Sequence, residues 1–349
     1  MENKVLESLE STFVIILDKI SIDTSNKGLL DVRDRLKKIF SYNVGHGKGI
    51  RALFVVKTFI LLAKHNGIET TKEDIELAQI LGASVEIMHA FALICDDIMD
   101  ESSTRRGRPC WYKQDDVGLQ ALNDGIILMN ESFHTLKLFL GHKKSYPIIM
   151  ETVHEMMRYT TYGQHMDMAS NSNNTGPRFD LFTKSRYETI VKYKTSYYTF
   201  VLPVRLAMYL FGMKSKSAHR QAEELLLKIG YLFQMQDDFI DCFGDPIVTG
   251  KQGSDIADGK CCWPVVRALE LCDESQRRHL VANYGIKCEQ NVYKCKEIYR
   301  QLNLKDVYLK EELTIYEEIC GDLQNLKNGN KISKEIFEFI LEKVYKRKY

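Results

Sequence analysis

The sequence predicts an all-α protein, a bundle of helices packed around a central cavity. Over most of the 349 residues, apolar side chains recur at a spacing of three and four, the period of a helix with one buried face. No stretch keeps the apolar-polar alternation that would build a sheet. Only 6 prolines and 21 glycines interrupt the chain, and nothing in its middle reads as a linker, so we expect a single domain, 1–349.

The helical segments follow one another with breaks that are rich in turn-forming residues. The breaks are expected near 24–28, 104–109, 141–147, 170–177 and 243–264. Between them the apolar period predicts helices at 5–22, 29–40, 50–65, 72–95, 117–140, 146–167, 187–211, 217–236, 263–283 and 289–302, with more helix in the tail. The helices 72–95 and 217–236 both lead into acidic clusters and are expected to face each other across the cavity.

Composition excludes several classes of function. The net charge of +1 indicates no bulk attraction to nucleic acid or membranes. We expect no stretch of the roughly 18 to 20 apolar residues needed to span a bilayer, and therefore no stable membrane insertion. The nine cysteines lack paired or zinc-like spacing and are interpreted as reduced, small apolar residues. Residues 1–22 mix charges into their apolar positions, unlike a targeting signal, so the expected location is cytoplasmic.

Two acidic pentads are the strongest functional signal. The first pentad is Asp96-Asp97-Ile98-Met99-Asp100, and the second pentad is Asp237-Asp238-Phe239-Ile240-Asp241. On a helix the first and fifth residues share one face, and at its carboxyl end carboxylates also meet the negative end of the helix dipole. A single pentad could be a solvated helix end. Two copies, each followed by a basic, glycine-rich loop, predict Mg²⁺ that is shared with the phosphates of a diphosphate.

Cationic residues lie near both pentads. Arg105 and Arg106 follow the first pentad, where they could hold phosphate oxygens or simply pair with the same aspartates. Lys251 and Lys260 lie in and after the glycine-containing loop that follows the second pentad. Upstream, the glycine-rich stretch 45–51 carries Lys48 and Arg51 and opens a helix. Its free backbone amides and two cations predict a second anion site.

These residues resemble the conserved motifs of farnesyl diphosphate synthase and its relatives. The resemblance is carried by 96–107 and 233–246, and it extends through the Gly47/Lys48/Arg51 motif, Tyr162-Gly163-Gln164, Lys194-Thr195 and Lys251 to the basic tail at 345–348. It covers nearly the whole chain. It implies the all-α isoprenoid synthase (trans-prenyltransferase) fold, a homodimer, a prenyl diphosphate substrate and three Mg²⁺ ions.

The resemblance also implies roles for individual residues. Asp96, Asp100 and Asp237 would be the leading metal ligands, with Asp97, Asp238 and Asp241 in support. The allylic diphosphate would be held by Arg105, Lys194, Thr195, Gln234, Lys251 and Lys260, among which Lys194, Thr195 and Gln234 are the candidate catalytic residues. The site for isopentenyl diphosphate would be formed by Lys48, Arg51, Arg106 and the residue at position 89.

The sequence departs from the family pattern around the second substrate. His46 stands where the family has a glycine, and His89 where it has a glutamine. Ile50 and Ala52 also differ from the pattern. In the pocket, Phe91 and Ala92 replace two bulky residues, which extends the expected cavity towards Met88, while Phe91, Phe233 and Phe239 could stabilise a carbocation.

These departures favour a Mg²⁺-dependent terpene synthase that ionises a prenyl diphosphate, with farnesyl diphosphate as the expected substrate. The carbocation would then cyclise or lose a proton. The alternative is a farnesyl or geranylgeranyl diphosphate synthase, because the charges of Lys48, Arg51 and Arg106 are retained. A third reading, from another class, is a non-catalytic prenyl diphosphate-binding subunit.

Overall fold

The computed structural model describes residues 2–172, 176–245, 253–326 and 332–345. These residues form two compact units. Unit 1 comprises 1–154, 202–219 and 331–336, and unit 2 comprises 155–201, 220–330 and 337–349. The described residues are predominantly helical, and their strands form two hairpins of two-residue strands, so the predicted all-α class is confirmed. The prediction of a single domain stays a prediction.

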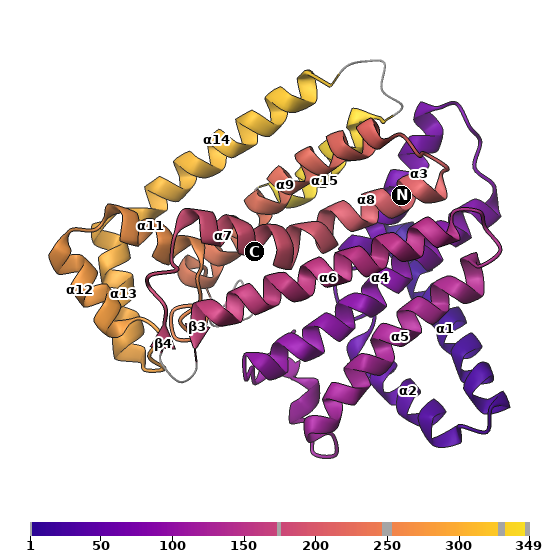
Figure 1. The fold of residues 1–349 in the computed structure, drawn as a ribbon, viewed down its shortest axis with the longest axis horizontal. Coiled ribbons are helices and arrows are strands. Elements are labelled where there is room, and N and C mark those ends of the chain that lie inside the picture. Colours follow the sequence, from indigo (N-terminus) through magenta and orange to yellow (C-terminus); the bar gives the residue numbers. More distant parts are fainter. Residues whose placement is uncertain (1, 173–175, 246–252, 327–331, 346–349) are drawn as a thin grey trace. The chain divides into compact units, whose positions relative to one another are not determined.

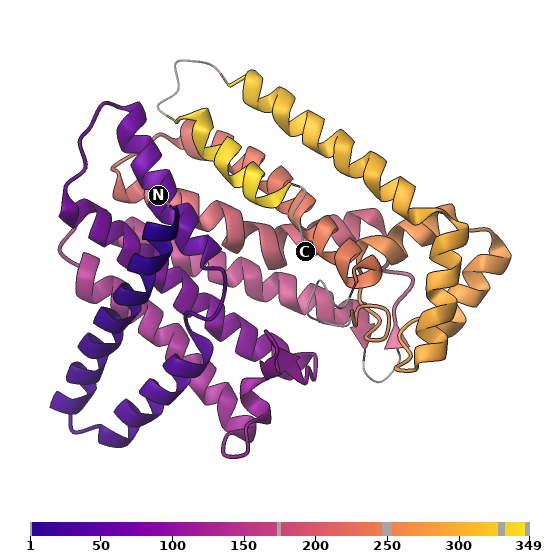
Figure 2. The same cartoon turned by 180° about the vertical axis from the view of Figure 1, so that it is seen from behind.

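Unit 1 holds the amino-terminal half of the chain. Its elements are α1 (Glu2–Asn26), α2 (Leu30–Asn43), α3 (Ile50–His65), α4 (Lys72–Met99), β1 (Thr104–Arg105), β2 (Arg108–Pro109), η1 (Trp111–Lys113), η2 (Gly118–Gln120), α5 (Ala121–Leu140) and α8 (Leu202–Leu210). The helices α6 (Tyr146–Ser170), α9 (Lys216–Phe243) and α15 (Lys334–Val344) contribute residues to both units. In Figure 2 the hairpin of α1 and α2 is visible in indigo.

Helix α4 forms the centre of unit 1, where it packs against α3 and α5 (Figure 1). It approaches α3 so closely that a Cβ at Gly82 would lie 2.8 Å from Ala52 Cα. Helix α4 is also long and apolar enough to cross a membrane, so the expectation that no stretch has this length and composition is wrong. However, 78% of that apolar window is buried in the fold, as is typical of a core helix.

Unit 2 is built around a core of large aromatic residues. Its further elements are β3 (Asn171–Ser172), β4 (Gly176–Pro177), α7 (Lys184–Ile190), η3 (Val191–Val201), α11 (Trp263–Leu271), α12 (Glu274–Asn283), α13 (Glu289–Gln301) and α14 (Leu304–Gln324). The side chains of Trp263, Tyr284, Tyr299 and Phe200 are completely or almost completely buried. The core of unit 1 combines buried aliphatic residues with rings such as Phe40 and Trp111.

Two of the expected helices are divided. The segment expected as one helix at 187–211 consists of α7, the π-helix η3 and α8. The segment 263–283 breaks before Asp273, whose side chain accepts a hydrogen bond from the Gln276 backbone and forms a capping box that starts α12. In contrast, the helices expected at 72–95 and 217–236 continue further and include most of the two pentads.

Candidate functional site

The first pentad occupies the last turn of α4, with Asp100 as its carboxyl-terminal cap. Asp97 is 4% exposed, whereas Asp96 and Asp100 are half-buried. The guanidinium of Arg105 donates from Nε and Nη2 to Asp97 Oδ1 at 2.9 and 2.5 Å, and from Nη2 to Asp96 Oδ2 at 3.3 Å. Burial raises the pKa of Asp97, and Arg105 opposes that rise. The pentad is therefore anchored to β1 by a charge-assisted pair.

The hairpin of β1 and β2 directs Arg106 towards the stretch 45–49. Arg106 and Gly107 both have positive φ angles, 54° and 72°, which turn the chain between the strands. A Cβ at Gly47 would lie 2.5 Å from Arg106 Nη2 and 2.8 Å from its Cζ. Glycine at position 47 thus permits the close approach of the arginine. Burial lowers the pKa of the Arg106 guanidinium.

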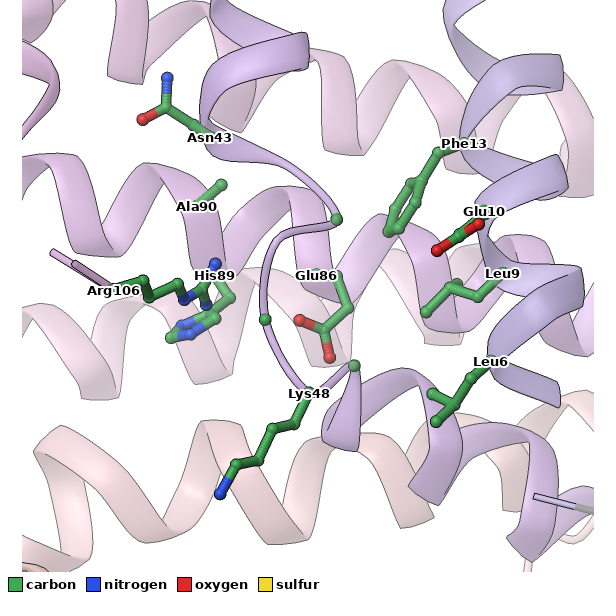
Figure 3. A pocket seen from close by; sticks show the side chains of 13 residues that line it. Leu6, Leu9, Glu10, Phe13, Asn43, Lys48, Glu86, His89, Ala90 and Arg106 are labelled. Atoms are coloured by element: carbon green, nitrogen blue, oxygen red, sulfur yellow. The ribbon is translucent and has the colours of Figure 1, made fainter. Parts of the chain in front are cut away.

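A pocket of about 220 Å³ surrounds this stretch of chain (Figure 3). On one side are apolar side chains of α1, including Leu6, Leu9 and Phe13. The other side carries Lys48, Glu86, His89 and Arg106. The pocket therefore combines apolar side chains with two cations, Lys48 and Arg106, and two carboxylates, Glu10 and Glu86, and it includes three of the residues predicted to bind the second diphosphate.

Glu86 changes the predicted second anion site. The amino end of α3 has Gly49 as its cap, with φ of 58° and no side-chain hydrogen bond. Instead, Glu86 Oε1 accepts hydrogen bonds from the backbone amides of Arg51 at 2.9 Å and Ala52 at 3.2 Å. These two amides at the start of α3 are therefore held by a carboxylate, while the anion site itself stays a prediction. Anion binding at this place depends on the Lys48 and Arg51 side chains.

His89 is 8% exposed and neutral. Burial and the neighbouring Arg51, Arg106 and Arg105 hold its pKa well below 6.5, because each disfavours the imidazolium. A neutral imidazole offers one donor and one acceptor, as a glutamine side chain offers both kinds of group. The departure from the family pattern at position 89 therefore preserves the charge of the site.

The second pentad lies in the last turns of α9. Asp238 is 5% exposed, and Asp237 and Asp241 are half-buried. Asp238 Oδ1 accepts from Gln234 Nε2 at 2.8 Å, and Oδ2 accepts from the Trp263 backbone amide at 2.9 Å. Burial raises the pKa of Asp238 to about 7, since these donors are neutral and compensate the desolvation incompletely.

Asp241 holds the chain that follows the second pentad. Its Oδ1 accepts from the Asp255 amide at 3.0 Å and its Oδ2 from the Ser254 amide at 3.3 Å. A Cβ at Gly253 would overlap the Asp241 carbonyl oxygen. Lys251 precedes this stretch and lies outside the described residues, as do the basic residues 346–348 of the tail.

The lysines Lys194 and Lys260 both contact Asp167, a residue that the sequence analysis missed. Asp167 Oδ2 lies 2.6 Å from Lys194 Nζ and 3.3 Å from Lys260 Nζ. Burial would raise the pKa of Asp167, but the two ammonium groups outweigh it and lower the pKa to about 2. The available signal was its place on α6, one turn after the Gly163 of the family motif.

Thr195 and Gln234 are also brought together in unit 2. The Thr195 hydroxyl donates to Gln234 Oε1 at 2.9 Å, while the Gln234 amide donates to Asp238. The three candidate catalytic residues Lys194, Thr195 and Gln234 therefore belong to one hydrogen-bonded region around η3 and α9. Their catalytic roles stay predictions.

The predicted pocket residues are placed less clearly. Phe91 packs towards α5, where a Cβ at Gly125 would lie 3.4 Å from its ring. Ala92 is half-buried and Met88 is 2% exposed. Phe233 packs edge-on against Phe200, with ring centroids 5.3 Å apart. Whether these residues line a prenyl cavity stays a prediction.

Phe239 has another partner. Its ring stacks on Tyr308, with centroids 3.8 Å apart, and also contacts the ring of Phe243 at 4.9 Å. One face of this ring is therefore covered by another aromatic residue. That arrangement is typical of core packing rather than of an open face for a carbocation.

The donor atoms fit Mg²⁺ when each pentad is taken by itself. The described residues contain no ready cluster of three His, Cys, Asp or Glu ligands. Each pentad instead holds its second aspartate inside the protein and leaves the first and fifth half-buried. Mg²⁺ takes one or two protein carboxylates and completes its octahedral shell with water and phosphate. Asp96 with Asp100, and Asp237 with Asp241, offer ligands of that kind.

The chain matches the polyprenyl synthetase family over residues 33–302. It is 41% identical to the farnesyl pyrophosphate synthase of Nezara viridula over 323 residues, which cover 93% of this chain and 78% of that protein. It is 38% identical to the farnesyl pyrophosphate synthase of Gallus gallus, with coverage of 98% and 94%. Among solved structures, farnesyl diphosphate synthase of T. brucei superposes with a TM-score of 0.90 at 28% identity, covering 100% of both chains.

The helical fold, the two acidic pentads and these similarities all indicate the same family. The chain belongs to the farnesyl diphosphate synthase family of trans-isoprenyl diphosphate synthases.

Proposed function

We propose that this protein is a prenyltransferase, a farnesyl diphosphate synthase that condenses an allylic diphosphate with isopentenyl diphosphate. The observation that carries this proposal is the retention of cations in the pocket around residues 45–49, which Glu10 and Glu86 also line. Lys48 and Arg106 line the pocket, Arg51 opens the adjoining helix, and the substituted His89 is neutral. These cations would hold a second diphosphate through charge-assisted hydrogen bonds. The names of the similar proteins favour the same activity.

This proposal reverses the preference that the sequence alone suggested. The terpene synthase hypothesis treated His46 and His89 as damage to the isopentenyl site. However, the buried imidazole of His89 is uncharged, so it adds no repulsion to the cations around it. The Nε2 atom of His46 lies 2.6 Å from the Ser41 carbonyl oxygen, so this side chain helps to hold the turn itself.

The chain's own residues would act on the allylic substrate through charge and position. Lys194 and Lys260, held side by side by Asp167, supply positive charge for the diphosphate that leaves. Arg105 supplies a further cation at the first pentad. Mg²⁺ bound at the pentads would neutralise the charge that develops on the diphosphate oxygens. As the allylic C–O bond breaks, the electron pair leaves with the diphosphate and an allylic carbocation remains.

The second substrate would meet this carbocation. Lys48, Arg51 and Arg106 hold its diphosphate, so its terminal double bond can attack the allylic carbon and form the new C–C bond. The intermediate then loses a proton and gives the longer prenyl diphosphate. The departed diphosphate would accept this proton. Positioned cations and exclusion of water account for most of the rate enhancement in such a scheme.

The terpene synthase remains a second candidate because of one observation. Ala92 lies one turn before Asp96 on α4, where the family resemblance implies a bulky residue, and it is half-buried. A pocket enlarged there could accept a farnesyl chain as substrate, or release a longer product. We also propose a homodimer, a Mg²⁺ requirement and a cytoplasmic location, which the family resemblance favours.

Product analysis of the purified protein tests these proposals. With Mg²⁺, dimethylallyl or geranyl diphosphate and isopentenyl diphosphate, we expect farnesyl diphosphate. With farnesyl diphosphate alone, we expect no volatile product. Volatile terpenes from farnesyl diphosphate without any elongation would overturn the proposal and restore the terpene synthase. Absence of turnover under both conditions would favour a binding subunit.

A further inference from the structure

The π-helix η3 is an unusual element at a critical place. It spans Val191–Val201 and carries both Lys194 and Thr195. π-helical turns are rare and are frequently found at functional sites. The Ser196 hydroxyl donates to the Val191 carbonyl oxygen, five residues earlier, at 3.1 Å, so a side chain also supports the wider turn.

Helix α6 meets η3 through a glycine and an aspartate one turn apart. A Cβ at Gly163 would overlap the Lys194 backbone nitrogen, and it would lie 2.5 Å from Lys194 Cα and from the Tyr193 carbonyl carbon. Backbone atoms cannot rotate away from such a contact. Four residues later, Asp167 binds the Lys194 ammonium at 2.6 Å. Close backbone contact and side-chain capture thus act on the same residue of η3.

Helix α9 repeats this arrangement on another face of η3. A Cβ at Gly230 would lie 2.5 Å from Ser196 Cβ and 3.0 Å from Ser196 Cα. Four residues later, Gln234 accepts the hydrogen bond of the Thr195 hydroxyl at 2.9 Å. Residues 194–196 are therefore held by two helices in the same way. Each helix contributes a close glycine contact and, four residues later, a side chain that hydrogen-bonds to η3.

We infer that Gly163 and Gly230 are positioning residues for the allylic diphosphate. By admitting the wide π turn between α6 and α9, they place the Lys194 ammonium on Asp167 and the Thr195 hydroxyl on Gln234. A methyl group at either glycine displaces the turn and separates these partners. The inference rests on the proposed function for the identity of the ligand, but it concerns residues that touch no substrate.

Alanine substitutions with a matched control test this role. Gly163→Ala and Gly230→Ala are compared with Gly321→Ala on α14, where an added methyl meets nothing within 4 Å. We expect both test variants to raise KM for the allylic diphosphate at least tenfold and to leave KM for isopentenyl diphosphate within twofold. Gly321→Ala should change neither constant. Equal rises in both KM values, or no rise in the allylic KM, would overturn the inference.

A second substitution across the contact provides a rescue. Ser196→Gly removes the Oγ and Cβ atoms that the methyl group of Gly230→Ala would meet. The double variant should therefore lower most of the rise in allylic KM that Gly230→Ala causes. Ser196→Gly should not lower the raised KM of Gly163→Ala. Rescue of both, or of neither, would contradict a local displacement of η3.

A binding measurement separates this inference from the proposed function. Calorimetry with inorganic diphosphate and Mg²⁺ requires no turnover, so it applies even if the wild type proves inactive in condensation. We expect Kd to rise at least tenfold in the two glycine variants and not in Gly321→Ala. If the glycine variants do not fold, Ser196→Ala replaces them, because it adds no atom and removes the hydroxyl that supports η3. It should raise Kd about threefold, and an unchanged Kd would overturn the inference.

Discussion

The two acidic pentads share a sequence pattern but are anchored differently. In both, the second aspartate is buried and the first and fifth remain nearer the surface. Asp97 pairs with a cation, the guanidinium of Arg105, from a hairpin only a few residues away. Asp238 is held by neutral donors, the Gln234 amide and the backbone amide of Trp263. The same motif therefore depends on local electrostatics in unit 1 and on tertiary packing in unit 2.

This difference indicates a division of labour within each pentad. The second aspartate is buried and held inside the fold in both pentads, whereas the first and fifth are half-buried, and Asp241 also accepts hydrogen bonds from the Asp255 and Ser254 amides. Buried carboxylates in one unit can also differ widely. Asp167 and Asp238 are both deeply buried in unit 2, yet lysines lower one pKa to about 2 and neutral donors leave the other at about 7. Partners, rather than burial alone, decide the charge state.

The largest expected effect comes from Asp238→Ala. The substitution leaves the Gln234 amide and the Trp263 backbone amide without their acceptor, and each unsatisfied buried donor costs about 1–3 kcal/mol. We expect a loss of about 3 kcal/mol in the free energy of unfolding, measured in urea. Asp237→Ala is the control within the same pentad. It should cost under about 0.5 kcal/mol, as surface substitutions do, but should abolish Mg²⁺-dependent turnover. Equal losses of stability would refute the division of labour.

Arg105→Ala should be the next largest. It leaves the buried Asp97 carboxylate without its cation, and removing one partner of a buried pair is strongly destabilising. Because the Arg105 side chain is 37% exposed, water will compensate in part, and we expect a loss of about 2 kcal/mol. Arg105→Lys should recover less than half, since an ammonium cannot reproduce the two-nitrogen contact. Full recovery by lysine would show that charge alone anchors the first pentad.

The pH dependence of stability sharpens the comparison further. The folded-state pKa of Asp238 is raised to about 7, so its contribution is fully present below about pH 4 and is lost as the pH rises through 7. Asp167 behaves in the opposite way. Its folded-state pKa is about 2, so its contribution is present above about pH 4 and is lost as the pH falls towards 2.

Metal-free unfolding of three proteins measures both effects. Between pH 5 and 8 in EDTA, the wild type should lose roughly 2 kcal/mol relative to Asp238→Asn, which does not titrate. Relative to Asp167→Asn, the wild type should instead lose its advantage between pH 4 and 2. Parallel stability curves for the wild type and Asp238→Asn would show that this carboxyl group remains ionised throughout.

Salt should produce the smallest effect and separate the two anchors. The Arg105–Asp97 pair is partly exposed, so raising NaCl from 0.05 to 0.5 M should weaken it by about 0.5 kcal/mol. The neutral donors of Asp238 should be insensitive. A double-mutant cycle at each pair, repeated at the two salt concentrations, measures the coupling. A salt response at Gln234–Asp238 equal to that at Arg105–Asp97 would remove the distinction.

Much of the fold could be predicted from the sequence, because helix periods and breaks are local. The helix at 50–65 was predicted to the residue, and both pentads fall at helix ends as expected. The π-helix was missed, since its hydrogen-bond pattern depends on what α6 and α9 press against it. The break before Asp273 carried a capping signal, Asp followed by Gln three residues later, that the apolar period concealed.

The candidate site was predicted in its residues but not in its connections. The pattern singled out Lys194, Gln234 and Arg105, whereas it was silent about Asp167 and Glu86. Both of these carboxylates lie inside helices that carry predicted site residues, but the partners that they bind are distant in sequence. Family resemblance predicts the residues that would bind substrate more readily than it predicts the residues that position those side chains. Positioning residues of this kind are identified only from the packing of the folded chain.

The carboxylate of Glu86 at the amino end of α3 has a kinetic consequence. It occupies the backbone amides of Arg51 and Ala52 and offsets the positive end of that helix. A diphosphate bound at Lys48 and Arg51 would therefore lie close to the negative charge of Glu86. That charge would weaken the binding of the diphosphate, and most affinity differences at one site appear in the rate of dissociation. Under the proposed function, Glu86 would therefore raise the rate at which the second diphosphate leaves the site.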